Sequence, residues 1–231
     1  MTFWYDVSDP ILMPSWSIVR MCAVVCAFCC SMFGCSRDEY VGAPIEARVV
    51  DDKSGGGLEG VHVVAAWQVK GGWEGGNIEG YLEVRETVTD TSGMFRIPGW
   101  GPKANPWHGG FGETAPRIML FKPGYEYRSV ANKQPPTTRG KLVSDWDGKT
   151  IALSEFVGPP AMYYEKLGWL RTHLHTLDNG AGDHWREIPR FLCAGARFER
   201  KLAAEGAPDA LPSYNTLARE KGLRCQAAGD E

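Results

Sequence analysis

Hydrophobic and polar positions alternate along much of residues 44–153, and this alternation predicts strands. In residues 44–51 apolar side chains alternate with charged ones, as in a strand with one face in solvent. Residues 62–69 are almost continuously apolar, which predicts a central strand covered on both faces. Further short extended runs lie at residues 81–88, 94–97, 117–121, 127–130 and 149–153. Short strands separated by turn signals predict an antiparallel β-sandwich.

The period of the apolar positions changes after residue 156, and the new period predicts helices. Three helices are expected, over residues 162–177, 185–204 and 209–224. Pro189 falls in the first turn of the second helix, where proline is tolerated. Each helix has an apolar side and therefore needs a partner surface. That surface is either the sandwich itself or another envelope protein, and the sequence leaves both alternatives open.

The hairpin at residues 87–97 lies in the middle of the predicted sandwich. Its turn contains Asp90 and Gly93. An aspartate side chain can accept a hydrogen bond from the backbone two residues on, and glycine adopts positive φ without steric cost. We therefore interpret both residues as determinants of the fold and not as functional groups.

Three motifs in order resemble the carboxypeptidase regulatory-like domain. They are LEGVHV at 58–63, VTDTSGMF at 88–95 and FKPGY at 121–125. That domain is a transthyretin-like sandwich of seven strands, and the resemblance covers roughly residues 44–153. It implies an α+β protein in which an antiparallel transthyretin-like β-sandwich, residues 44–156, is followed by a helical C-terminal extension, residues 157–231.

The same resemblance implies a role without catalysis. Domains of this family usually serve as binding, adhesion or folding modules, so we expect that the protein is not an enzyme. The expectation includes no catalytic residue, no metal and no cofactor. The segment PGWGP at 98–102 resembles an exported bacterial subgroup of the family.

A thirteen-residue apolar run at 21–33 predicts export. A helix needs about 20 apolar residues to span a bilayer, so this run fits the apolar core of a secretory signal instead. It ends in Gly34 and Cys35, which resembles a bacterial lipobox, where the cysteine is lipidated and becomes the mature N-terminus. We therefore predict a lipoprotein signal at 1–34, lipidation of Cys35 and a tether at 35–43. The alternatives are a plain cleaved secretory signal and a buried helix.

Cysteine usage is consistent with export. Four of the seven cysteines lie in the predicted signal, and Cys35 would carry lipid. Cys193 and Cys225 remain as a pair, which an oxidising compartment would join in a disulfide. Two buried free thiols are the alternative.

Aromatic side chains in two loops rich in glycine and proline are the candidate ligand-binding residues. Trp73 lies in the loop at 71–80, and Trp100, Trp107 and Phe111 lie in the segment 100–113. Exposed aromatic rings on rigid loops can stack on sugars. A carbohydrate-binding accessory module is therefore the alternative function. The competing interpretation is that these rings fold back and cover the sandwich or dock the helices.

Charge and motif content bound the remaining function classes. The net charge is −3 and the isoelectric point about 6.0, which argues against nucleic acid as a partner. A metal-dependent hydrolase using His173, Asp183 and His184 is a weaker third hypothesis, since no HExxH motif occurs. The leading hypothesis is a lipid-anchored binding or structural module on the outer membrane, facing the periplasm or the surface. Its partners would be the membrane and a glycan or an envelope protein.

Overall fold

The computed structural model describes residues 39–71, 77–107, 110–111, 115–133, 137–138, 140–175, 177, 184–207, 214–220 and 222–225. The predicted signal, the predicted lipidation site Cys35 and the candidate Trp73 lie outside these residues. Asp38–Glu231 forms one compact unit. Within the described ranges, no helix is long and apolar enough to cross a membrane.

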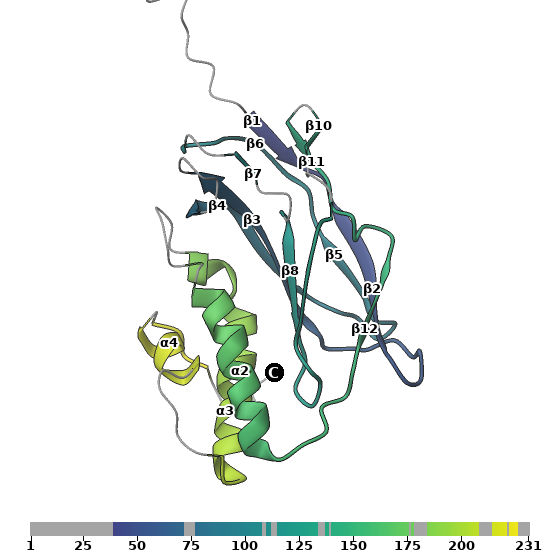
Figure 1. Ribbon diagram of the computed structural model, residues 1–231, viewed down its shortest axis with the longest axis vertical. Helices are drawn as coiled ribbons and strands as arrows, with labels where there is room; N and C mark the ends of the chain where they lie inside the picture. Colours follow the sequence, from purple (N-terminus) through teal and green to yellow (C-terminus); the bar gives the residue numbers. More distant parts are fainter. Residues whose placement is uncertain are drawn as a thin grey trace, which may run out of the picture. The chain divides into compact units, whose positions relative to one another are not determined.

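Two sheets make up the sandwich (Figure 1). One sheet has the order β4 (Asn77–Val88), β3 (His62–Gly71), β8 (Arg117–Phe121) and β9 (Arg128–Ala131), with the short β7 (Gly110–Phe111) also on β3. The other has the order β12 (Thr150–Leu153), β2 (Ile45–Asp51) and β5 (Met94–Ile97). Each predicted strand corresponds to one of these. The pairing is antiparallel as predicted, except that β12 runs parallel to β2.

A further small sheet has the order β10 (Thr137–Thr138), β11 (Lys141–Leu142), β1 (Glu39–Gly42) and β6 (Trp100–Ala104). From sequence, β1 was expected to be part of a tether and β6 part of a loop, and both predictions are wrong. These strands are four and five residues long, and β6 contains glycine and proline, so neither carries a readable alternation. A Cβ added at Gly42 would lie 2.2 Å from Trp100 Nε1, so the indole packs directly on the β1 backbone.

The C-terminal part is helical, as predicted. It contains α2 (Pro160–His175), the 3-10 helix η2 (His184–Glu187), α3 (Pro189–Ala204) and α4 (Tyr214–Glu220). The predicted second helix is divided into η2 and α3, and Pro189 occupies the start of α3. Proline is favoured there because its fixed φ suits the first turn and its missing N–H has no intrahelical acceptor.

Strand β3 is buried on both faces and so separates two cores. Val63, Ala65, Trp67 and Val69 belong to the core between the two sheets. Val64 and Ala66 belong to the core between the sheet and the helices. Helices α2 and α3 therefore cover the outer face of the β4-β3-β8-β9 sheet, as Figure 1 also shows. The sequence left two partner surfaces open for the helices, and in the structure the helices pack on the sandwich.

Glu86 of β4 fixes the start of α3 on the sheet. The first turn of α3 has no side-chain cap of its own. The Glu86 carboxylate accepts hydrogen bonds from the backbone N–H groups of Arg190, at 3.0 Å, and Phe191, at 2.9 Å. A carboxylate at this end satisfies two free donors and complements the helix dipole. Burial raises the pKa of Glu86, and the two backbone hydrogen bonds oppose that rise.

The hairpin turn at Asp90 is built as predicted. Its Oδ1 accepts hydrogen bonds from the backbone N–H groups of Ser92 and Met94, both at 2.9 Å, and from the Ser92 hydroxyl at 2.7 Å. The Ser92 hydroxyl is the largest cause of a lowered Asp90 pKa. Gly93 has φ +80°, and a Cβ there would lie 2.3 Å from the Val49 carbonyl oxygen. Both residues thus serve the fold.

The predicted disulfide between Cys193 of α3 and Cys225 is present and closes a loop with a sequence separation of 32. We predict that replacing both cysteines by alanine lowers the free energy of unfolding by about 3–4 kcal/mol, because the open loop gains entropy in the unfolded chain. Urea denaturation measures the change. The wild-type protein with its disulfide reduced should unfold like the double variant. An unchanged unfolding midpoint would contradict the prediction.

Candidate binding site

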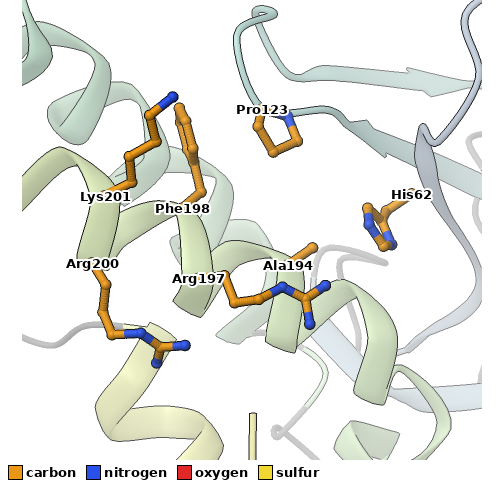
Figure 2. A pocket seen from close by; sticks show the side chains of 7 residues that line it. All are labelled: His62, Pro123, Ala194, Arg197, Phe198, Arg200 and Lys201. Carbon is orange, nitrogen blue, oxygen red and sulfur yellow. The ribbon is translucent and has the colours of Figure 1, made fainter. Parts of the chain in front are cut away.

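A groove lies between α3, the first residue of β3 and the turn after β8. Its main part is a cavity of about 380 Å³ lined by His62, Pro123, Ala194, Arg197, Phe198, Arg200 and Lys201 (Figure 2). A second cavity of about 270 Å³ shares Pro123, Phe198 and Lys201 with the first. It extends the groove toward α2, where its lining is largely apolar and aromatic. The first volume is in the range of small-molecule sites, and the second is just below it.

The wall on the side of the sheet is a tight turn. The backbone N–H of Tyr125 donates to the carbonyl of Lys122 at 3.0 Å. Gly124, after Pro123, has φ +87°. Proline followed by a residue with positive φ is typical of a type II turn. The turn thus holds the Pro123 ring against the groove.

Two other parts of the chain hold this turn. From α2, the Tyr163 hydroxyl donates to the carbonyls of Lys122 and Tyr125. From the strand side, Lys122 Nζ donates to the Glu59 carbonyl at 2.7 Å. The turn is therefore fixed both to the helices and to the segment that leads into β3, so this wall of the groove is preformed.

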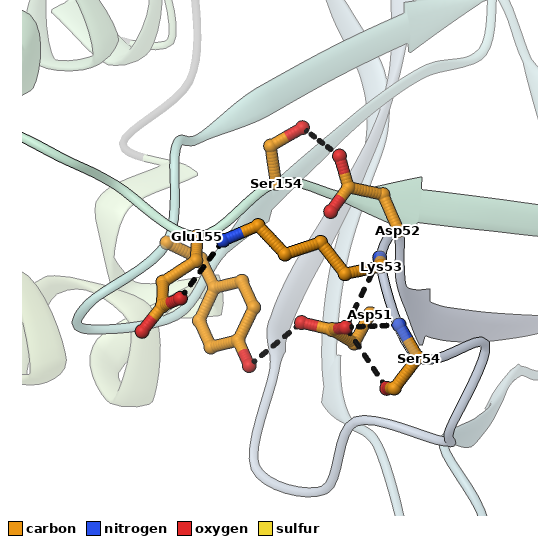
Figure 3. Close-up of polar contacts among 7 residues, drawn as sticks. Asp51, Asp52, Lys53, Ser54, Ser154 and Glu155 are labelled. Carbon is orange, nitrogen blue, oxygen red and sulfur yellow. Dashed lines mark hydrogen bonds and ion pairs between the residues drawn. The ribbon is translucent and has the colours of Figure 1, made fainter.

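The loop after β2 also supports the turn. Asp51 Oδ1 accepts hydrogen bonds from the backbone of Lys53 and Ser54 and from the Ser54 hydroxyl (Figure 3). The Ser54 backbone bond is the largest cause of a lowered Asp51 pKa. Lys53 Nζ lies 3.3 Å from Glu155 Oε2, and the Tyr125 hydroxyl donates to Asp51 Oδ2 at 3.2 Å. The loop after β2 is thus connected to the groove wall.

Helix α3 forms the opposite wall. Ala194, Arg197 and Lys201 are spaced three and four residues apart, which places them on one side of the helix. Because alanine has a short side chain, it leaves the space that the longer neighbours border. Figure 2 shows the Arg197 guanidinium extending toward the side of the cavity where His62 lies.

Arg200 is different, although it lines the same cavity. Its side chain points away from the other lining residues in Figure 2, and its Nη2 donates to the Cys225 carbonyl at 3.3 Å. It therefore belongs to the contacts around the disulfide. No hydrogen bond or ion pair of the Arg197 guanidinium occurs in the part of the chain that the structure describes.

His62 is the titratable side chain that β3 contributes to the cavity lining. Its ring centroid lies 6.5 Å from that of Phe191, and its buried Nδ1 has no hydrogen-bond partner among the described residues. Burial lowers its pKa from 6.5 to about 4, and the charges of Arg197, Lys122 and Arg190 add to the effect. The imidazole is therefore neutral at pH 7. None of the described residues that line the first cavity is acidic.

The predicted ligand-binding aromatics lie elsewhere. Trp100 is buried in the core between the sheets, 5% exposed, with its ring centroid 5.3 Å from that of Trp67. Trp107 and Phe111 are half-buried and pack against the same core. In this position Trp100 offers no exposed ring to a sugar. Sugar binding by Trp107 and Phe111 stays a prediction, and Trp73 lies outside the described residues.

The metal hypothesis finds no site in the described ranges. Among those residues, no three His, Cys, Asp or Glu side chains are grouped so that they could hold a metal ion. His184 packs edge-on against Tyr81, with ring centroids 5.9 Å apart. Asp183 and the His173 side chain lie outside the described residues.

The sequence does not identify His62 and Arg197 as a pair, although each is a polar residue next to buried ones. His62 is the first residue of the buried strand β3, on the face opposite Val63. Arg197 lies between the buried Ala196 and Phe198 of α3. Only the docking of α3 on the sheet brings the two together, and no spacing in the sequence encodes that.

No protein-family model matches the chain, and no curated protein matches it. Among solved structures, 3-chlorocatechol 1,2-dioxygenase from Rhodococcus opacus is 16% identical at a TM-score of 0.29, over 52% of this chain and 62% of that one. The group B streptococcus pilus 2b backbone protein is 16% identical at a TM-score of 0.25, over 49% and 41%.

Two further similar structures are also of enzymes. A dioxygenase domain from Streptomyces sp. SirexAA-E is 14% identical at a TM-score of 0.26, over 53% of this chain and 84% of that one. A 9R-lipoxygenase from Cyanothece is 11% identical at a TM-score of 0.28, over 80% and 28%. The prediction that the protein is not an enzyme is corrected on this finding, since three of the four structures named here are of enzymes. Similarity at these TM-scores assigns no reaction to this chain.

We predict that the pKa of His62, followed by NMR of its ring, is about 4. An Arg197→Gln variant should raise it, because a nearby positive charge is lost, whereas Arg200→Gln should leave it unchanged. The folded-state pKa is lowered, so the unfolded chain binds the extra proton below about pH 6.5. Stability should therefore fall as the pH drops from about 6.5 through the folded-state pKa. A His62 pKa near its ordinary value would contradict the environment described.

Proposed function

We propose that the protein is an exported, lipid-anchored binding module of the cell envelope, with the groove beside α3 as its ligand site. The observation that carries the binding role is the groove itself. It is concave, and its wall at Pro123 is held by hydrogen bonds from two directions. One end presents the guanidinium of Arg197, which has no hydrogen bond or ion pair among the described residues, and the other end presents an aromatic surface. Preformed clefts with apolar walls and a few polar groups are typical of small-molecule sites.

The export part of the proposal is supported by the sequence and by one covalent bond. The apolar run at 21–33 and the Gly34-Cys35 pair that follows it are typical of a lipoprotein signal. The disulfide between Cys193 and Cys225 supports an oxidising compartment, because such bonds are rare in the reducing cytosol. The outer membrane, facing the periplasm or the surface, is the proposed location.

The finer fold is part of the same proposal. We infer a carboxypeptidase regulatory-like, transthyretin-like sandwich from the three motifs at 58–63, 88–95 and 121–125. The pairing of β12 with β2 and of β2 with β5, opposite a sheet built around β3, supports it. Of the two ligand sites considered, the groove is favoured over the loop aromatics, since Trp100 is enclosed in the core.

Labelling with radioactive palmitate in a bacterial host tests the anchor. The full chain should become labelled and sediment with membranes, and Cys35→Ser should lose the label. Cys30→Ser is the matched control, because it removes a neighbouring cysteine within the apolar run and should leave labelling intact. A Cys35→Ser protein that is still labelled would overturn the proposed anchor.

A further inference from the structure

We propose that the groove binds an amphipathic anion, with a carboxylate or phosphate head at Arg197 and an apolar body extending along Phe198 toward Tyr163. This inference deepens the proposed function, because it rests on the groove being the ligand site. The charges at one end of the groove, the apolar surface at the other and the place of the nearest acidic side chain support it.

The head-group end is positive and open to an anion. Arg197 is half-buried beside the cavity and has no ion pair within the described part of the chain. The positive charges of Lys122 and Arg190 also act on His62, which lines the same cavity. A partly desolvated guanidinium binds carboxylate and phosphate through charge-assisted, bidentate hydrogen bonds.

His62 adds a hydrogen-bonding group at this end. Its neutral imidazole lies opposite the α3 wall in Figure 2, and its buried Nδ1 lacks a partner among the described residues. A buried polar atom without a hydrogen bond costs free energy. A ligand that gives Nδ1 a hydrogen-bond partner removes this cost, and its binding is favoured by the same amount. Because the imidazole is neutral, the positive charge that binds the anion is that of Arg197.

The tail end is aromatic and apolar. The rings of Phe156 and Tyr163 stack with centroids 4.2 Å apart, and Tyr163 meets Phe198 edge-on at 4.8 Å. Together with Leu202 they line the second cavity, which joins the first at Phe198. An apolar chain placed here is removed from water, which is favourable in proportion to the area buried.

The acidic side chain nearest the groove gives the ligand its orientation. Glu205 lines the second cavity and lies 3.9 Å from Lys201 Nζ, so the charge of this lysine is already opposed. An anion at that end would meet Glu205, whereas an anion near Arg197 meets no acidic lining residue of the first cavity. The head group is therefore placed at Arg197 and the tail toward Leu202.

The test is an NMR titration of the full-length chain carrying Cys35→Ser, so that no attached acyl group competes for the groove. Four probes are compared: octanoate, octyl phosphate, inorganic phosphate and 1-octanol. Octanoate or octyl phosphate should shift the amide signals of Ala194 and Arg197 saturably and raise the His62 pKa. Whichever of these two ligands binds more tightly identifies the head group as a carboxylate or a phosphate. Octanol and inorganic phosphate should bind at least about tenfold more weakly, because each lacks one half of the ligand.

Two variants of one helix complete the test. Arg197→Gln should weaken binding of the alkyl anion about tenfold and leave octanol unaffected, since only the charged contact is lost. Arg200→Gln, whose side chain points away from the groove, should bind like the parent. Equal binding of octanol and octanoate, equal binding of the two phosphates, an unchanged affinity in Arg197→Gln, or no binding by any probe would overturn the proposal. Each of these results leaves palmitate labelling at Cys35 unchanged, so the proposed lipid anchor and the proposed ligand can fail separately.

Discussion

The burial of β3 on both of its faces is the constraint on which the other features depend. Val63 and Trp67 require the β12-β2-β5 sheet on one side, and Val64 and Ala66 require the helices on the other. A strand with apolar residues on both sides cannot remain half-solvated without a large cost, because each buried aliphatic side chain contributes about 1.5–3 kcal/mol. The helical part is thus a required cover of the sheet.

The groove is a consequence of how that cover is attached. Glu86 holds the start of α3 on β4, and the disulfide at Cys193 joins the middle of the same helix to the chain near its end. After Cys193, α3 passes the turn at Pro123, which Tyr163 and Lys122 fix in place. The short side chain of Ala194 then leaves a cavity where a longer one would have filled the space.

The sequence predicted the elements well and their contacts poorly. Alternation located the strands at 44–51 and 62–69, and the chemistry of Asp90 and Gly93 located the hairpin, because these signals are local. The residues of β6 predict a loop, and they leave open whether Trp100 is exposed or covers the sandwich, because glycine and proline conceal a strand whose partner lies far away in sequence. The candidate site combines residues of β3, a turn and α3, and no local pattern specifies that they meet.

Equilibrium unfolding tests the central claim most directly, namely that sandwich and helices share β3 as a common core strand. Far-ultraviolet circular dichroism at the helical band reports α2 and α3, and tryptophan fluorescence reports buried indoles such as Trp67. With the disulfide intact, the two signals should follow a single coincident urea transition, as expected for one cooperative unit. A helical signal that is lost at lower urea, while the fluorescence transition stays in place, would contradict the account.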